Sequence, residues 1–292
     1  MTASSLRGAR RRFPLLALCA GAFAYSACQR SAAEAPSTSQ QPTVPEGWEM
    51  VWHDEFDGSG LPDPSHWSYD VGGHGWGNNE LQSYTEARAE NARIKDGHLI
   101  IEARHEAYEG AEYTSARLTT KGHGEWTHGR FVIRARLPEG RGTWPAIWML
   151  PVEWTTGDGG WPDVGELDIM EHVGHNLGVI HASAHSRDYQ WQVGTQKTGT
   201  IEIPDATTAF HDYILEWTPD VIRAFVDDRL YFEYENEGLG WSKWPYTQDF
   251  YLILNIAVGG AWGGEQGVDP DVFPQRMEVD YVRVYQQSKT ER

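Results

Sequence analysis

The stretch GELDIMEHVG, residues 165–174, has three carboxylates within six positions of an otherwise apolar run bracketed by glycines. A short apolar run between turn residues is typical of a β-strand. Side chains on a strand alternate between two faces, so Glu166 and Asp168 share one face while the apolar residues beside them point into a core. Glu171 is out of phase with the other two acids. The stretch therefore predicts a strand whose regular alternation is interrupted once.

One extra residue in this strand would bring the third acid onto the face of the other two. We expect a β-bulge at about Ile169 and Met170, because bulges re-aim side chains and are over-represented beside active sites. The two glutamates could then lean to the separation of about 5 to 5.5 Å that retaining glycosidases have between their carboxyl groups. Crowded carboxylates cannot all ionise easily, so one keeps its proton near neutral pH. The pattern thus indicates glycoside cleavage.

Two other interpretations of these acids are open. Most charge clusters are simply solvated faces of strands, and this one could be another. Alternatively, Glu171, His172 and His175 could bind a metal, since their spacing resembles a zincin motif. Zincin ligands need a helix, whereas glycines at 165, 174 and 178 bracket a stretch rich in β-formers. The strand interpretation is therefore favoured over the metal site.

Period-two alternation dominates the rest of the chain. In one example, Phe131, Ile133 and Ala135 alternate with Arg134 and Arg136. Many short strands with turn residues between them predict an all-β fold, an antiparallel β-sandwich jelly roll whose curved inner sheet forms an open substrate cleft. The expected strands are 99–103, 117–120, 131–137, 146–150, 178–184, 211–217, 221–226, 250–257 and 277–285.

Composition narrows the class of ligand. The formal net charge of -18 disfavours nucleic acid and other polyanions, so a neutral polymer is the expected partner. Fourteen tryptophans are present, and tryptophan can lie flat on a sugar ring. We expect most of them in the core, and we expect the glycine-flanked Trp76 and Trp262 in a cleft wall.

The N-terminus predicts export. A positive segment with four arginines between positions 7 and 12 precedes an apolar stretch over 13–25 that is too short to span a bilayer permanently. Residues 25–28 resemble a bacterial lipobox, so the protein would be either secreted or anchored to the membrane by a lipid at Cys28. Cys19 would be removed with the signal, which leaves no disulfide framework. The expected segments are a signal peptide at 1–27, a linker at 28–45, a catalytic domain at 46–287 and a tail at 288–292.

From residue 48 to 285 the chain resembles the laminarinase-type members of glycoside hydrolase family 16. The resemblance is carried by the core Glu-x-Asp-x-x-Glu at 166–171 and by the segments WHDEF (52–56), GNNELQ (77–82), TWPAIWML (143–150), NIAVGG (255–260) and DYVRVY (280–285). It implies that Glu166 is the nucleophile, Glu171 the acid/base and Asp168 a residue that tunes the nucleophile. Relatives with the extra residue, here Met170, mostly act on β-1,3-glucans.

The resemblance also implies ligands outside the acidic core. The aromatic residues would stack on sugar and the polar ones would fix hydroxyls, although a loop histidine, a core tryptophan or an ion-paired arginine could be purely structural. The implied substrate-binding residues are Asn79, Arg117, Trp144, Trp148, His185 and Trp262. A structural calcium would be held by the backbone carbonyls of Glu55 and Gly97 and the Asp280 carboxylate. No cofactor is expected for catalysis.

These observations predict an extracytoplasmic, monomeric endo-acting β-1,3-glucanase that hydrolyses laminarin-like β-glucan with retention of configuration. A relative acting on mixed-linkage glucan or galactan, or one working as a transglycosylase, is an alternative within the enzymes. A non-catalytic carbohydrate-binding protein is the alternative from another class, because lectins share the jelly-roll architecture. The crowded acids favour the enzyme, since binding alone does not need them.

Overall fold

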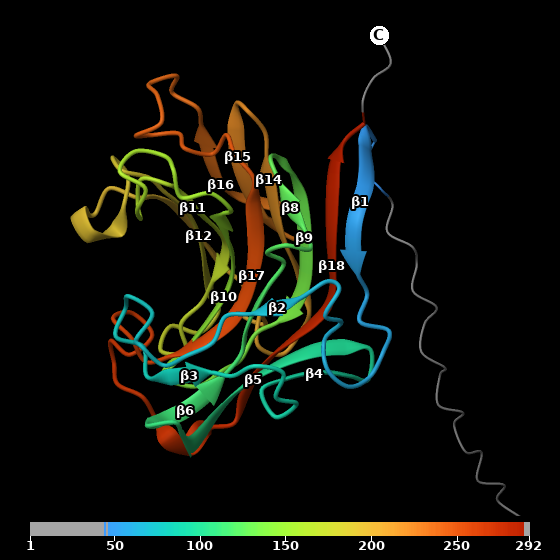
Figure 1. Ribbon diagram of the computed structural model, residues 1–292, viewed down its shortest axis with the longest axis vertical. Coiled ribbons are helices and arrows are strands. Elements are labelled where there is room, and N and C mark those ends of the chain that lie inside the picture. The colour runs from blue at the N-terminus through green and yellow to red at the C-terminus, as the bar shows by residue number, and fades with distance from the viewer. Residues whose placement is uncertain (1–43, 45, 289–292) are drawn as a thin grey trace, which may run out of the picture. The chain divides into compact units, whose positions relative to one another are not determined.

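Two β-sheets packed face to face form the protein (Figure 1). The computed structural model describes residues 44 and 46–288. Within them, regular structure consists of strands and two short 3-10 turns, η1 (Trp191–Val193) and η2 (Pro270–Val272), and no helix is long and apolar enough to cross a membrane. The expected signal peptide, Cys28, most of the linker and residues 289–292 lie outside the described residues, so these expectations stay predictions.

The larger sheet contains ten of the strands found in the described residues, in the order β16-β15-β14-β9-β18-β5-β6-β3, with β1 beside β18 and β4 beside β5. Its pairs are antiparallel except β3 with β6, which is parallel. Its strands are β1 (Trp48–Asp54), β3 (Gln82–Tyr84), β4 (Ala92–Lys95), β5 (His98–Tyr108), β6 (Ala111–Ser115), β9 (Gly129–Arg136), β14 (His211–Trp217), β15 (Val221–Val226), β16 (Arg229–Glu235) and β18 (Gln275–Gln287).

The smaller sheet contains eight of the described strands, in the order β13-β12-β11-β10-β17-β7-β2, with β8 beside β17. All of its pairs are antiparallel. Its strands are β2 (Ser68–Tyr69), β7 (Arg117–Thr119), β8 (Glu125–Trp126), β10 (Thr143–Pro151), β11 (Glu166–Glu171), β12 (Val179–His185), β13 (Lys197–Glu202) and β17 (Phe250–Val258).

The predicted alternation explains how the two sheets bury a core between them. Phe131, Ile133 and Ala135 of β9 are fully buried, whereas Arg134 and Arg136 from the same strand point outward to acidic partners. The expected segments all contain strand, and β14 and β15 have the predicted bounds. One continuous apolar cluster fills the space between the sheets. The smaller sheet therefore has one face on this core and the other free to carry a site.

Candidate active site

The predicted bulge in β11 is confirmed. On the β10 side, Met170 pairs with Ile147 and Asp168 pairs with Trp148, so Ile169 has no partner. The register with β12 also breaks between Asp168 and Glu171. Ile169 and Met170 thus occupy a place where a regular strand would have one residue, which defines a β-bulge.

The bulge explains how three acids share one face. Ile169 and Met170 are both fully buried in the apolar core, so neither takes an alternating position on the other side of the sheet. Glu166, Asp168 and Glu171 consequently all line the same cleft. Burial of Asp168, which is 3% exposed, argues against a merely solvated strand face.

The cleft has a volume of about 1000 Å³ and crosses the smaller sheet from β7 to β13. It thus runs over six strands, which corresponds to about 24 Å at roughly 4.8 Å between neighbouring strands. Its walls come from loops at both ends of these strands. The lining side chains include His74, Trp76, Asn78, Glu80, Arg117, Trp144, Trp148, Trp154, Trp161, Glu166, Asp168, Glu171, His181, His185, Trp191, Thr198, Thr200, Asn255, Trp262 and Glu265.

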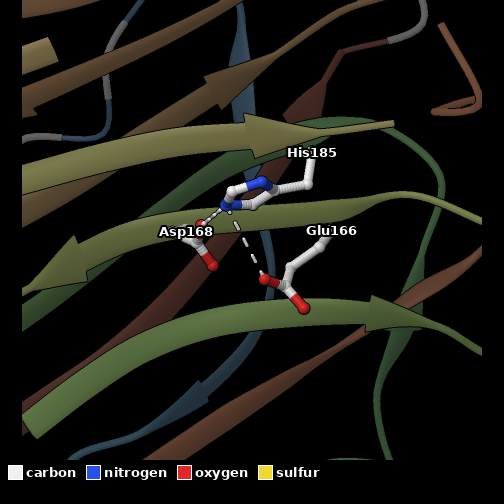
Figure 2. A group of neighbouring side chains, drawn as sticks. All are labelled: Glu166, Asp168 and His185. Carbon is white, nitrogen blue, oxygen red and sulfur yellow. Dashed lines mark ion pairs between the residues drawn. The ribbon is translucent and has the colours of Figure 1, made fainter. Parts of the chain in front are cut away.

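One imidazole serves two of the acids. His185, on β12, has its Nε2 3.1 Å from Asp168 Oδ2 and 3.9 Å from Glu166 Oε1 (Figure 2). Figure 2 shows the imidazole directed toward both carboxylates. At the other end of β11, Trp144 Nε1 donates a hydrogen bond of 2.9 Å to Glu171 Oε1. The two glutamates therefore have different partners, which suits different roles.

The acids of this site hold protons more tightly than ordinary carboxyl groups do. Burial raises the pKa of Glu166, Asp168 and Glu171, and for both glutamates the negative charge of Asp168 raises it further. The charge of His185 opposes the rise in the pKa of each glutamate. The group therefore carries fewer than three negative charges near neutral pH.

The β7 end of the cleft is built around one arginine. The Arg117 guanidinium carbon lies 4.7 Å from the ring centroids of both Trp76 and Trp148. Its Nε donates to Asp70 Oδ2 at 2.9 Å, and Trp148 Nε1 donates to Asn255 Oδ1 at 2.7 Å. Arg117 thus both forms an ion pair and lines the cleft, and its contacts fix the indole rings beside it.

A second aromatic group lies beside the acid/base end of β11. The rings of Trp144 and Trp262 meet edge to face with centroids 5.6 Å apart, and His181 meets Trp262 in the same way at 4.8 Å. His181 pairs in register with Glu171. Aromatic faces and polar edges therefore surround the catalytic acids, as recognition of a neutral sugar requires.

The comparisons with known proteins agree with this geometry. A model of the protein family described as glycosyl hydrolases family 16 matches residues 79–283. The chain belongs to glycosyl hydrolase family 16. A beta-glucanase of Rhodothermus marinus is 64% identical over 243 residues, which is 82% of this chain and 85% of that protein. A glucan endo-1,3-beta-glucosidase of Cryptopygus antarcticus is 40% identical over 259 residues, or 81% of this chain and 91% of that one.

A solved structure also matches. The X-ray structure of the laminarinase from Rhodothermus marinus superposes with a TM-score of 0.82 at 62% identity, covering 83% of this chain and 98% of that one. The jelly-roll class expected from the sequence is thereby confirmed. As a family 16 member with these relatives, the chain is a glycoside hydrolase.

Eight of the nine residues predicted for catalysis or binding in this family 16 hydrolase lie together in the cleft. Asn79 differs from the other eight, because its side chain is exposed and is not part of the lining, and its role in binding stays a prediction. Asn79 has a φ of 58° in a tight turn where the amides of Asn78 and Glu80 both donate to the Gly75 carbonyl. Asparagine tolerates this left-handed conformation well, which accounts for its presence there.

Its neighbour Glu80 is a cleft residue that the sequence analysis missed. Glu80 accepts hydrogen bonds from Gln82 Nε2 at 2.7 Å and from Asn78 Nδ2 at 3.2 Å, and burial raises its pKa. An acid within a glycine- and tryptophan-rich loop was the available signal. With Glu80 and Glu265, the lining of the cleft contains five carboxyl groups.

The tryptophans are also distributed differently from the prediction. All fourteen lie in the described residues, and seven of them line the cleft, whereas four are fully inside the core. Trp76 and Trp262 are in the cleft wall as expected. The cleft, rather than the core, therefore accounts for the high tryptophan content.

The zincin-like metal site is not formed. His172 is fully buried, and its Nε2 accepts the Gly178 amide at 3.1 Å. Burial, with His181 and His175 nearby, lowers the pKa of His172 to about 4. Glu171 faces the cleft instead. Among the described residues, one group of three or more histidine, cysteine or acidic side chains has its possible ligand atoms within 4.8 Å of one another. It consists of Glu166, Asp168 and His185.

The predicted calcium ligands lie on β18 or next to strands that pair with it. This strand pairs with β1, which ends just before Glu55, and with β5, which follows the turn at Gly97. Carbonyl and carboxylate oxygens suit a hard cation. The Asp280 carboxylate, however, has the Arg134 Nε 3.3 Å away, so a guanidinium already lies on one side of it. Calcium at this position stays a prediction.

Proposed function

We propose that this protein is an endo-acting β-1,3-glucanase that hydrolyses laminarin-like β-glucan with retention of configuration. The observation that carries the proposal is the bulge in β11, which directs Glu166, Asp168 and Glu171 into one aromatic cleft. The names of the two relatives described above, a beta-glucanase and a glucan endo-1,3-beta-glucosidase, support the same substrate class. The laminarinase structure from Rhodothermus marinus supports it as well.

In the first step, the Glu166 carboxylate attacks the anomeric carbon while Glu171 gives its proton to the departing glycosidic oxygen. The bond from carbon to the leaving sugar breaks as the bond to Glu166 forms. In the second step, water attacks the anomeric carbon and gives a proton to Glu171, while the bond from that carbon to Glu166 breaks and restores the carboxylate. Two inversions at one carbon give net retention.

The surroundings suit these roles. Arg117 opposes the rise in the pKa of Glu166, in addition to the effect that His185 has on both glutamates, and so favours the ionised form that a nucleophile needs. Glu171 lies farther along the strand, where burial and the charge of Asp168 raise its pKa. A raised pKa keeps the acid protonated at the start of the reaction. The charge of Asp168 thereby tunes the pKa of both glutamates.

The shape of the cleft supports action within a polymer. A groove about 24 Å long, at the strand spacing already used, holds several consecutive sugar units. Seven tryptophans along it offer faces for uncharged rings. A net charge of -18 disfavours sulfated or other anionic polysaccharides. We therefore propose a neutral β-glucan as the substrate and a monomer as the working form.

Export and calcium belong to the proposal as well. The N-terminal sequence supports secretion or lipid anchoring at Cys28. Replacing Cys28 with serine would release the protein from the membrane fraction if the anchor exists. A structural calcium would raise the thermal midpoint of unfolding when added to chelator-treated protein, and Asp280→Asn would abolish that rise.

The experiment that tests the function is product analysis with the wild type and Glu166→Ala on laminarin, lichenan and agarose. We expect a mixture of laminari-oligosaccharides early in the time course and a loss of hydrolysis on the order of a thousandfold or more in the variant. Azide should restore bond cleavage in Glu166→Ala by replacing the missing nucleophile. Stronger cleavage of lichenan or agarose would reassign the linkage, and binding without cleavage by the wild type would indicate a lectin.

A further inference from the structure

A second bulge lies across the core from the bulge in β11. In the larger sheet, Phe232 of β16 pairs with Ala224, and Leu230 pairs with Phe225. Tyr231 therefore has no partner on β15, just as Ile169 has none on β10. Each of these two bulges thus has one extra residue, and the two extra residues are in contact.

The bulge in β16 turns a tyrosine inward. Phe232 and Tyr234 face the core and Glu233 faces solvent, so regular alternation would place Tyr231 in solvent beside Glu233. Instead Tyr231 packs against the main core, and Leu230 is 50% exposed. The register shift is what gives this tyrosine an inward direction.

The hydroxyl of this tyrosine reaches the catalytic strand. Tyr231 Oη donates a hydrogen bond of 3.1 Å to the backbone carbonyl of Ile169. A bulge leaves ladder positions unpaired, and a buried carbonyl without a partner is costly. The bond therefore stabilises β11 in the bulged register at the one position where the neighbouring strands do not fix it.

We propose that Tyr231 is a positioning residue of the hydrolase, which holds the bulge of β11 and thereby sets the direction of Glu171 toward the glycosidic oxygen. The inference rests on the proposed function. Tyr231 is not part of the cleft lining, so it acts through the backbone rather than on the substrate. Glu171 is two residues beyond the bonded carbonyl, and a change of phase at Ile169 would rotate its side chain away from the other acids.

Two further features agree with this role. Burial, followed by the charges of Tyr213, Glu171 and Asp168, raises the pKa of Tyr231 well above its ordinary value, so the hydroxyl stays a donor at every working pH. On β13, Gly199 lies against this part of β16. A Cβ there would collide with the Tyr231 carbonyl oxygen and lie 3.0 Å from Phe232 Cβ. Glycine at this position lets β16 come close enough for the tyrosine to span the core.

The test compares Tyr231→Phe with Tyr213→Phe. Tyr213 is the control, because it lies in the same sheet, is fully buried, and its hydroxyl has no hydrogen-bond partner among the described residues. We expect Tyr231→Phe to lower kcat on laminarin between about tenfold and a hundredfold with KM nearly unchanged, as small misplacements of a catalytic group do. Tyr213→Phe should keep the wild-type kcat.

Leaving-group dependence separates positioning from a general loss of structure. A dinitrophenyl glycoside needs little protonation to depart, so kcat/KM for dinitrophenyl β-laminaribioside should fall less than threefold in Tyr231→Phe. The alkaline limb of the pH profile on laminarin should also move, since the surroundings of Glu171 change. Gly199→Ala, which displaces Tyr231, should show the same pattern while circular dichroism confirms the fold.

Other results would overturn the inference. A Tyr231→Phe variant with lower thermal stability but wild-type kcat and pH profile would make the tyrosine purely structural. An equal loss of kcat/KM on laminarin and on dinitrophenyl β-laminaribioside would also exclude action through Glu171. If the wild type failed to cleave laminarin but cleaved another glucan, the proposed substrate would be wrong. The kcat of Tyr231→Phe and of Tyr213→Phe relative to the wild type, measured on that glucan, would still decide the role of Tyr231.

Discussion

The outer face of the larger sheet and the cleft face of the smaller sheet both carry many carboxylates, but they arrange them in opposite ways. On the outer face, arginines lie beside acids on neighbouring strands. Arg130 pairs with Glu216, Arg136 with Glu278 at 2.6 Å, and Arg283 with Glu55 at 2.5 Å. In the cleft, Glu166 and Asp168 share the imidazole of His185, and Glu171 accepts a hydrogen bond from the Trp144 indole.

The difference separates acids that stabilise the fold from acids that do chemistry. A carboxylate beside a guanidinium is held in its charged form and gains hydrogen bonds. The cleft acids lose water without gaining an arginine partner of this kind, so burial raises the pKa of each. This arrangement costs stability and provides a proton donor, a compromise that is common at active sites. Four changes, from the largest expected effect to the smallest, test the contrast.

Glu171→Gln should have the largest of these effects. The amide keeps the size of the side chain and the hydrogen bond from Trp144 but cannot give or take a proton. We expect kcat on laminarin to fall about 10²- to 10⁴-fold, and the alkaline limb of the pH profile to disappear. Steady-state rates from pH 4 to 9 measure both, with folding checked by circular dichroism. A residual rate that kept the wild-type pH dependence would show that another group supplies the proton.

Arg283→Met breaks a pair on the outer face. Arg283 is 7% exposed and Glu55 is partly buried, so the change leaves a carboxylate without its cation. We expect the free energy of unfolding to fall by about 1 to 3 kcal/mol, while kcat stays the same. Urea denaturation gives the first quantity. A large change in kcat with unchanged stability would contradict the structural role given to these pairs.

Asp168→Asn should make the protein more stable at neutral pH, by about 1 kcal/mol. The folded pKa of Asp168 is raised above its unfolded value of 3.8. Its contribution to stability is therefore fully present below pH 3.8 and is lost as pH rises through the folded pKa. Thermal midpoints between pH 4 and 9 should decline less steeply in the variant, although its activity falls. If the thermal midpoints of wild type and variant changed with pH in parallel, the pKa of Asp168 would not be raised in the folded protein.

Arg223→Ala should have almost no effect. Arg223 Nε lies 2.5 Å from Glu233, but the two side chains are 38% and 41% exposed, so solvent screens the pair. We expect a change in unfolding free energy within about 0.5 kcal/mol and an unchanged kcat. This variant is the matched control for Arg283→Met. If Arg223→Ala lowered the free energy of unfolding as much as Arg283→Met, burial would not decide how strongly these ion pairs stabilise the fold.

Much of the fold and the catalytic centre could be predicted from local patterns. Period-two alternation in segments such as β9 determines which side chains face the core, and this gives strands and a sandwich. The phase of Glu171 relative to Glu166 requires one extra residue, so the bulge follows from counting positions. Both inferences use only neighbours in the chain, which a sequence displays directly.

The rest depends on contacts between distant segments. Whether Asn79 or Glu80 enters the cleft is decided by one turn with a positive φ, which composition does not specify. The inward direction of Tyr231 depends on the register between β15 and β16. Such registers are set when the sheets pack together. The role expected for Gly97 and the lipid anchor expected at Cys28 are not decided by the described residues and stay predictions.

The concentration of indole rings in the cleft gives this hydrolase an optical property. Half of its tryptophans lie where a bound sugar would exclude water from them, so the intrinsic fluorescence of the protein would respond directly to oligosaccharide binding. Trp144, bonded to Glu171, would in addition respond to the protonation of that acid. Occupancy and ionisation of the centre could then be followed by emission spectra of the unlabelled enzyme.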